Sequence, residues 1–306
     1  MPVFHTVVPI HNVDLGADAR FEFAGGLLLT ATPPWVPKQQ MLQGLSEDDR
    51  QAVQHASHAF VVTYEAAALG DPDPGWAGAD PKSIQETKYE LCVLANLALW
   101  LSRPCPVHFK VVIHAPQFEA EPVAQQVISR YSPLLCHPKD VGGRVTAADI
   151  ALATRLHSSV AALGRAGAVW TAAWATWVGL QMNIEVIRYV LFWMALEALF
   201  GPEDAREITY RLSQRVAFFL ASDRAEARGL FAVAKKGYGF RSKIVHGRWE
   251  EEADSEARMA EAEDLVRQSL VRVLEDEELR KTFSGKTRET FLDDIVFRNG
   301  YVQPER

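Results

Sequence analysis

The distribution of proline divides the sequence into two parts. Of the 16 prolines, only Pro202 and Pro304 follow residue 145, and Ala, Leu, Arg and Glu dominate that later part. This composition predicts a helical domain over residues 146–306, because proline breaks the interior of a helix. The first part, residues 1–145, mixes short apolar runs with Pro- and Gly-rich loops, which is typical of an α+β unit.

The spacing of apolar residues predicts the elements of both parts. In the first part we expect strands at residues 26–30, 58–64 and 107–114, and a helix at residues 83–101. In the second part we expect helices at residues 146–165, 168–181, 183–200, 203–220, 224–246, 254–277 and 288–297. Gly201 and Pro202 punctuate the third and fourth of these helices, since Gly suits a C-terminal cap and Pro the first helical turn.

Two of the expected helices carry apolar stripes at intervals of three and four residues, so both can join the core of a bundle. The stripes are Ile184, Ile187, Leu191, Met194 and Ala198, and Leu230, Val233, Gly237, Phe240 and Ile244. The helix at residues 183–200 is apolar on its other faces as well. It therefore lies at the centre of the bundle or also contacts a second subunit.

The charge and the cysteines exclude several classes of protein. A net charge of -7 argues against a general nucleic-acid coat, which needs a broad excess of Lys and Arg, and leaves a local basic patch open. Cys92, Cys105 and Cys136 lack the pairing of a zinc knuckle, so neither a disulfide framework nor a metal is expected. No dinucleotide or phosphate-loop fingerprint is present, so we expect no cofactor.

One uncharged stretch, residues 166–184, is long enough to span a bilayer. Trp170, Trp174 and Trp177 recur in it at helical spacing, which favours the buried stripe of a soluble helix. The N-terminus lacks the basic and then apolar order of a secretory signal. We therefore expect a cytoplasmic protein that does not contact a membrane.

A basic segment lies between residues 235 and 248 and contains no acidic residue. Its charged and titratable side chains are Lys235, Lys236, Arg241, Lys243, His246 and Arg248. In an acidic protein this segment is a candidate site for anions. The alternative is a solvated basic face balanced by Glu250, Glu251, Glu252 and Asp254, and composition leaves both readings open.

Arg241 and His246 together suggest RNA cleavage without a metal. A base must deprotonate the 2′-hydroxyl and a cation must stabilise the charge on the phosphorus, and His and Arg suit these roles. In a regular helix, however, positions five apart lie about 140° from one another. The two side chains reach one ligand only if the helix is distorted near Gly237 and Gly239, if it ends at Gly247, or if a second copy completes the site.

Glu197 is the only formal charge between Arg188 and Glu203, within an otherwise apolar helix. A buried carboxylate needs a partner. Arg211, Arg215 and Arg241 are the candidates. We favour an ion pair that positions one of these arginines over direct contact with a substrate.

Three linked motifs then indicate a family: RYVLFWMALEALFG, EITYRLSQRVAFFL and YGFRSKIVHG. In this order they resemble the Apea-like branch of the HEPN superfamily over residues 183–277. The resemblance implies an all-α bundle that dimerises and joins two Arg-x4-His motifs into one metal-independent ribonuclease site. Arg241 and His246 match the catalytic pair, Ser242 the polar residue after the Arg, and Glu197 the acidic position of the helix.

The sequence thus leads to two hypotheses. The first is an RNA endonuclease, a homodimer under control of a partner protein, in which six side chains bind RNA: Lys235, Lys236, Lys243, Arg248, Arg211 and Arg215. Members of the resembled superfamily act as toxins and in phage defence, often on transfer RNA. The second hypothesis is a non-catalytic module that binds a nucleotide or phosphorylated ligand in the same basic pocket.

Overall fold

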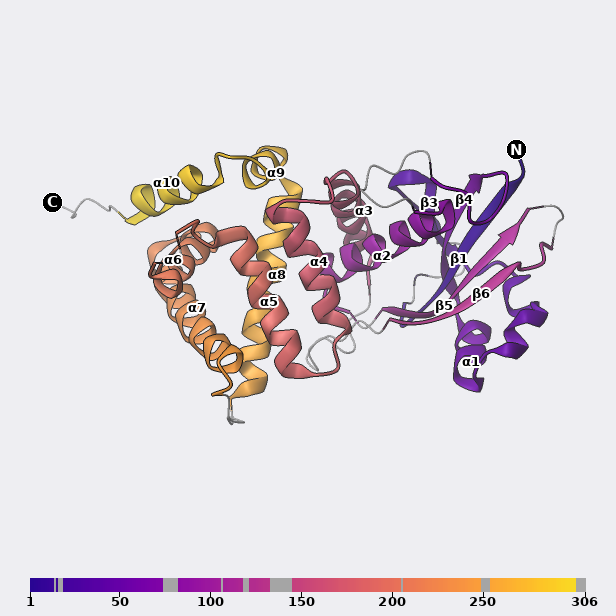
Figure 1. The fold of residues 1–306 in the computed structure, drawn as a ribbon, viewed down its shortest axis with the longest axis horizontal. Helices are drawn as coiled ribbons and strands as arrows, with labels where there is room; N and C mark the ends of the chain where they lie inside the picture. Colours follow the sequence, from indigo (N-terminus) through magenta and orange to yellow (C-terminus); the bar gives the residue numbers. More distant parts are fainter. Residues whose placement is uncertain are drawn as a thin grey trace. The chain divides into compact units, whose positions relative to one another are not determined.

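The computed structural model describes residues 1–13, 15, 19–73, 82–105, 107–117, 121–132, 145–204, 206–248 and 254–300. The chain forms two compact units, Met1–Ala162 and Leu163–Arg306, which are considered separately. The first contains an antiparallel sheet and the second is helical (Figure 1). None of the described helices is both long and apolar enough to cross a bilayer.

The boundary between the units differs from the one expected at residues 145/146, because helix α3 (Ala147–Ala161) belongs to the first unit. α3 packs against helix α2 (Ile84–Ser102) and strand β2 (Phe21–Phe23). His157 anchors it there: its Nε2 donates to the Leu91 carbonyl at 3.2 Å, and its ring meets Phe23 edge-on at 5.4 Å. The helical composition of this segment had placed it with the helices that follow.

The sheet of the first unit has, in the described residues, the strand order β2-β3-β4-β1-β5-β6, with antiparallel neighbours throughout. Its other strands are β1 (Val3–His11), β3 (Leu27–Ala31), β4 (His58–Glu65), β5 (His108–Pro116) and β6 (Gln126–Ser132). The three strands expected from the sequence are β3, β4 and β5. β1, β2, β6 and the short helix α1 (Glu47–His55) were not expected.

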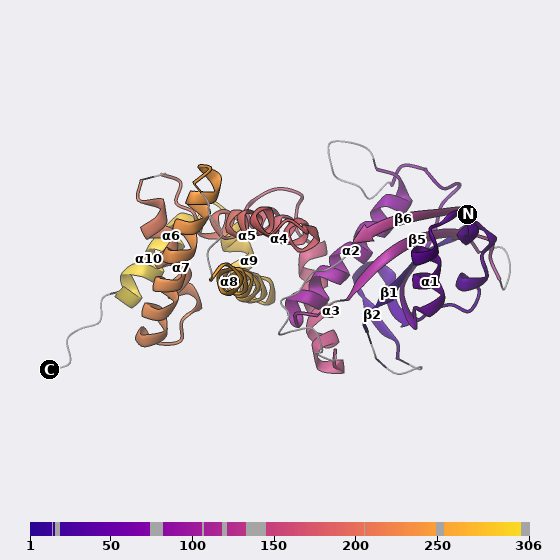
Figure 2. The same cartoon turned by 90° about the horizontal axis from the view of Figure 1, so that it is seen from below.

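Both faces of the sheet are covered (Figure 2). Val7 of β1 and Val61 of β4 share a core with Val53 of α1, while α2 contacts β1, β4 and β5. A strand covered on both faces is apolar at successive positions and does not alternate, which hides it from a search for period two. β1 also holds Pro9, and its register with β5 shifts between Val7 and Ile10. A proline without an N–H fits such an irregularity.

The helices of the second unit are α4 (Ala168–Gln181), α5 (Glu185–Phe200), α6 (Ile208–Leu220), α7 (Arg224–Val245), α8 (Ser255–Glu275), α9 (Glu277–Ser284) and α10 (Arg288–Gly300). α6 begins later than expected, so Pro202 does not lie in its first turn. α9 was not expected, since the expected helices ended at residue 277 and resumed at residue 288. Asp276 ends α8 and starts α9, where its carboxylate accepts from the backbone N–H groups of Glu278 and Leu279.

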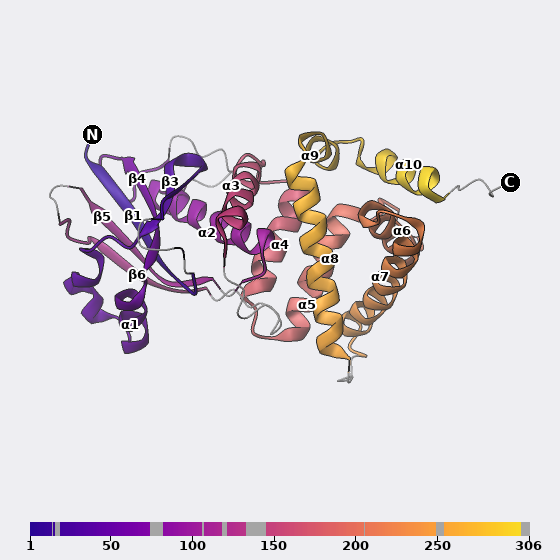
Figure 3. The same ribbon diagram turned by 180° about the vertical axis from the view of Figure 1, so that it is seen from behind.

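α5 lies at the centre of this bundle and contacts α4, α6, α7 and α8. Figure 3 shows α8 lying across α4 and α5. α5 crosses α7 at Gly237, whose carbonyl accepts from the Tyr189 hydroxyl at 2.9 Å. A Cβ on Gly237 would lie 2.5 Å from the Trp193 ring, so this glycine permits the close approach of two helices.

The first apolar stripe does not form the core of the unit, contrary to expectation. Ile184, Ile187 and Met194 are 56%, 44% and 40% exposed, while Tyr189 and Trp193 on another face of α5 are buried. The helix is apolar almost all round, so spacing alone did not show which face the other helices cover. The stripe is therefore an exposed apolar surface of the isolated chain.

Candidate functional site

His246 ends helix α7 as its C-terminal cap. The N–H of Gly247 bonds to the Ile244 carbonyl at 3.0 Å, and the N–H of Arg248 bonds to the Lys243 carbonyl at 2.8 Å. These two bonds form a Schellman motif, which needs a residue with positive φ, and Gly247 has φ 67°. His246 is exposed beside this cap, at the C-terminal end of the helix dipole.

Arg241 lies on another side of α7 and is held by α5. Its Nη2 contacts Glu197 Oε2 at 2.8 Å, and both side chains are 21% exposed. Tyr238, one turn earlier on α7, donates its hydroxyl to the other carboxylate oxygen of Glu197 and lies 5.4 Å from the Arg241 guanidinium carbon. Burial, and then the bond to Glu197, raise the pKa of Tyr238, so the phenol stays a donor.

Of the three arginines considered as partners of Glu197, the structure places Arg241 there. α7 is helical without interruption from Arg224 to Val245, so Gly237 and Gly239 do not distort it. Among the described residues, no hydrogen bond or ion pair joins Arg241 to His246. One chain thus presents a fixed guanidinium and an exposed imidazole on different sides of one helix.

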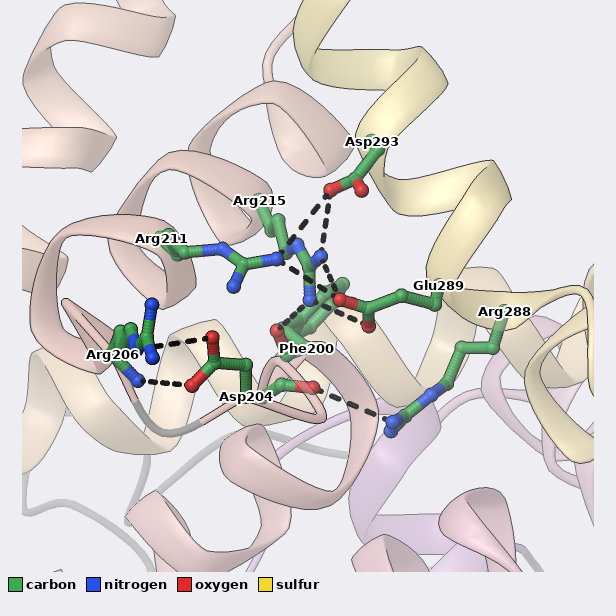
Figure 4. A network of polar contacts seen from close by, with 9 residues as sticks. Phe200, Asp204, Arg206, Arg211, Arg215, Arg288, Glu289 and Asp293 are labelled. Atoms are coloured by element: carbon green, nitrogen blue, oxygen red, sulfur yellow. Dashed lines mark hydrogen bonds and ion pairs between the residues drawn. The ribbon is translucent and has the colours of Figure 1, made fainter.

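Arg211 and Arg215, which were expected to bind RNA, are engaged inside the unit (Figure 4). Arg215 is 1% exposed and contacts Glu289 at 2.6 Å, Asp293 at 2.7 Å and the Phe200 carbonyl at 3.2 Å. Arg211 contacts Glu289 at 3.0 Å. This is a correction: the two arginines fasten α10 to α6 and do not present free cations to a ligand.

The acidic partners of this network were missed in the sequence. Glu289 and Asp293 are four residues apart on α10, as Arg211 and Arg215 are on α6. Two such pairs of opposite charge can face one another across two helices. The shared interval of four residues could therefore have indicated from the sequence that these two helices pair. Tyr238 was also missed, although it lies three residues before Arg241 and hence on the same helical face.

Among the other basic residues of segment 235–248, some form ion pairs and others are exposed to solvent. Lys236 pairs with Asp254 at 2.7 Å, which matches one contact of the balanced-face alternative, whereas Glu250, Glu251 and Glu252 lie outside the described residues. Lys235 lies 5.8 Å from the centre of the Phe231 ring. Arg248 is exposed, and Ser242 is half-buried with its carbonyl accepting from the His246 N–H at 3.1 Å.

An open groove of about 570 Å³ runs between α7 and α8. Lys235, Lys236 and Lys243 line it from α7 and Arg258 from α8. Arg258 lies 4.5 Å from the Phe240 ring and pairs with Asp254 at 3.0 Å. A groove with this excess of cations suits an anionic chain.

Within the described residues, no group of three or more His, Cys, Asp or Glu side chains is placed to hold a metal ion. The chain was compared with family models, with curated proteins and with solved structures, and none of them matches it.

Proposed function

We propose that this protein is a metal-independent RNA endonuclease whose site combines Arg241 of one copy with His246 of another. The observation that supports this most directly is the clamp on Arg241. Glu197 and Tyr238 hold the guanidinium in one place, as an anion-binding group that acts on a transition state requires. His246 is exposed, and an imidazole is a side chain that can accept and donate a proton in acid–base catalysis.

In the proposed reaction, His246 accepts the proton of a ribose 2′-hydroxyl, and that oxygen attacks the adjacent phosphorus. The bond from phosphorus to the 5′-oxygen breaks, this leaving oxygen takes up a proton from water, and His246 returns its proton to the solvent. Arg241 stabilises the negative charge on the nonbridging oxygens. The products are a 2′,3′-cyclic phosphate, which water can open to a 3′-phosphate, and a 5′-hydroxyl.

We propose a second copy because one regular helix directs these two side chains about 140° apart. The exposed stripe of α5 is the surface we propose for the dimer contact. Glu197 is three residues from Met194 and borders this stripe, so the clamped Arg241 lies beside the proposed contact. The resemblance to dimeric HEPN ribonucleases supports the same arrangement.

Cleavage of cellular RNA by the full-length protein tests the proposal. With a chelator present, the wild type should produce fragments with cyclic phosphate ends, and growth of the expressing cells should stop. His246→Ala and Arg241→Ala should each reduce cleavage by about 10² to 10⁴-fold. Lys286→Ala, an exposed cation in the same unit, is the matched control and should leave the rate unchanged. Transfer RNA is the first substrate to try.

Mixing the two inactive variants tests the shared site. A dimer of one Arg241→Ala copy and one His246→Ala copy retains one intact pair, composed of Arg241 from one chain and His246 from the other. Re-associated mixtures should therefore recover part of the activity that each variant lacks. If the mixture stays inactive while the wild type cleaves, the two residues act within one chain.

One observation favours a second candidate, a non-catalytic module that binds a phosphorylated ligand. Within one chain the described Arg241 and His246 do not contact each other, so a monomer presents a binding site without a catalytic pair. A protein that cuts no RNA, yet whose nucleotide affinity falls in Lys235→Ala and Lys243→Ala, would favour this function. Expression of the wild type should stop cell growth if the protein is a ribonuclease, and should not do so if it only binds a ligand.

A further inference from the structure

One outward stripe of α7 carries four of its six cations and leads to His246. Its members, separated by three or four residues, are Arg224, Arg228, Phe231, Lys235, Gly239, Lys243 and His246. At about 100° per residue they fall within roughly 120° of one another. The arginines, the lysines and His246 are exposed, whereas Arg241 lies on another side of the helix.

At the start of this stripe, α6 and α7 form a pocket of about 250 Å³. Tyr210 and Phe231 line it as an edge-to-face pair with centroids 5.3 Å apart, and Tyr210 is 47% exposed. Gln214 adds an amide that can donate and accept. An aromatic wall beside an amide suits a flat base with polar edges.

Arg224 and Arg228 complete the pocket. In the described part of the chain, neither guanidinium has a side-chain hydrogen bond or an ion pair. The nearby carboxylates serve the helix start: Asp223 accepts from the Glu226 N–H at 2.9 Å, and Glu226 accepts from the Ser222 N–H at 2.7 Å. Arg224 also lies in the first turn, where the helix dipole disfavours a cation. Two guanidinium groups that have no acidic partner among the described residues and line one pocket can bind a phosphate ligand.

The pocket and the groove between α7 and α8 share Phe231, so they join along the stripe. From Phe231 to His246 the helix rises by about 22 Å, at 1.5 Å per residue. A single nucleotide is too short to cover that distance. Stacking surfaces joined by a basic groove are typical of sites for single-stranded nucleic acid.

We propose that single-stranded RNA binds along this stripe, with a base in the pocket between α6 and α7 and its backbone passing Lys235 and Lys243 toward His246. This inference rests on the proposed function, because it assigns the substrate path of that ribonuclease. It adds RNA contacts outside the Arg-x4-His motif, at Tyr210, Arg228 and Lys235. It also explains how an acidic protein can bind RNA on one helix.

Fluorescence polarisation tests the path. The full-length His246→Ala protein, which should not cut RNA, is titrated into a labelled 15-nucleotide single-stranded RNA of mixed sequence. Tyr210→Ala should weaken binding about tenfold through lost stacking. Arg228→Glu should weaken it further and reduce the slope of log Kd against log salt by about 0.7 for each lost phosphate contact. Phe297→Ala and Lys286→Glu change an exposed aromatic and an exposed cation elsewhere in the unit, and should bind as the parent does.

The outcomes separate this inference from the proposed function. If the Tyr210 and Arg228 variants bind RNA like the parent while the protein with an intact His246 cleaves it, the path is wrong and the ribonuclease remains. If both variants lose binding but Arg241→Ala and His246→Ala cleave normally, the path stands and the proposed site fails. Equal or tighter binding of AMP or duplex RNA would overturn the assignment to a single strand. Melting temperatures equal to that of the parent show that both exposed substitutions leave the fold intact.

Discussion

Glu197 on α5 and Arg241 on α7 form an ion pair at 2.8 Å that joins the central helix of the bundle to the helix bearing His246. Tyr238 completes the clamp through the second carboxylate oxygen. Both carboxylate oxygens of Glu197 thus bind side chains of α7, and the packing of α5 against α7 fixes the direction of the Arg241 guanidinium. The candidate site therefore depends on the position of a helix outside its own motif.

Glu197→Gln should separate the charge of this clamp from its shape. The amide keeps a similar volume and can still accept a hydrogen bond, but it no longer balances the guanidinium. We expect RNA cleavage to fall about 10- to 100-fold through kcat, because Arg241 loses its fixed position. The free energy of unfolding should fall by about 1–2 kcal/mol. Glu261→Gln, at an exposed position of α8, is the matched control. Unchanged kcat in Glu197→Gln would show that Arg241 needs no positioning.

Gly237 and Gly239 allow the same substitution to be compared at a crowded and an open position of α7. A Cβ at Gly237 would lie 2.5 Å from Trp193 and 3.1 Å from the Tyr189 hydroxyl oxygen, whereas one at Gly239 meets nothing within 4 Å. Gly237→Ala should therefore destabilise the protein by about 1–3 kcal/mol through overpacking. Gly239→Ala should stabilise it by about 0.5–1 kcal/mol, because alanine favours the helix. Urea unfolding measures both, and equal effects would contradict the close crossing of α5 and α7.

Arg215 should act on stability and not on RNA binding. Arg215→Ala leaves Glu289 and Asp293 without their buried partner, so we expect a loss of about 3 kcal/mol or more. Arg206 is 89% exposed and pairs with Asp204 at 3.7 Å. Arg206→Ala should therefore lower the free energy of unfolding by less than about 0.5 kcal/mol. Thermal unfolding distinguishes the two. A variant of normal stability that loses RNA affinity would restore Arg215 as a substrate contact.

His157 should make the stability of the protein depend on pH. Burial lowers its pKa to about 4, while the bond to the Leu91 carbonyl acts in the opposite direction. A histidine with a lowered folded pKa contributes stability above its unfolded pKa of about 6.5, and this is lost as pH falls toward the folded value. Between pH 7 and pH 5 we expect a loss of about 1–2 kcal/mol.

The control for this effect is His157→Phe, which keeps a ring against Phe23 and removes the titration. Its unfolding free energy should be lower at pH 7 and should change less between pH 7 and pH 5 than that of the wild type. His55→Gln, at the exposed end of α1, should retain the full dependence. An equal pH slope in wild type and His157→Phe would assign the acid sensitivity to other groups.

Helical periodicity located α4 at its observed bounds and α5, α7 and α10 to within a few residues. It failed for β1, because a strand buried on both faces has no alternation, and for α9, because this short helix is mostly polar and buries only Phe283. It also assigned the wrong face of α5 to the core. An apolar pattern indicates that a helix must be buried, but the neighbouring helices determine which of its apolar faces they cover.

The sequence by itself determined that a part with strands precedes a helical part, the bounds of α4 and the end of α7, but it placed the boundary at residues 145/146 and not after Ala162. These depend on local chemistry: backbone hydrogen bonds, helix propensity and the positive φ that Gly247 adopts. Only the tertiary structure decided that Glu197 holds Arg241 while Glu289 and Asp293 hold Arg215. Each of these ion pairs joins helices distant in sequence, and the burial that makes a partner necessary exists only after the helices pack.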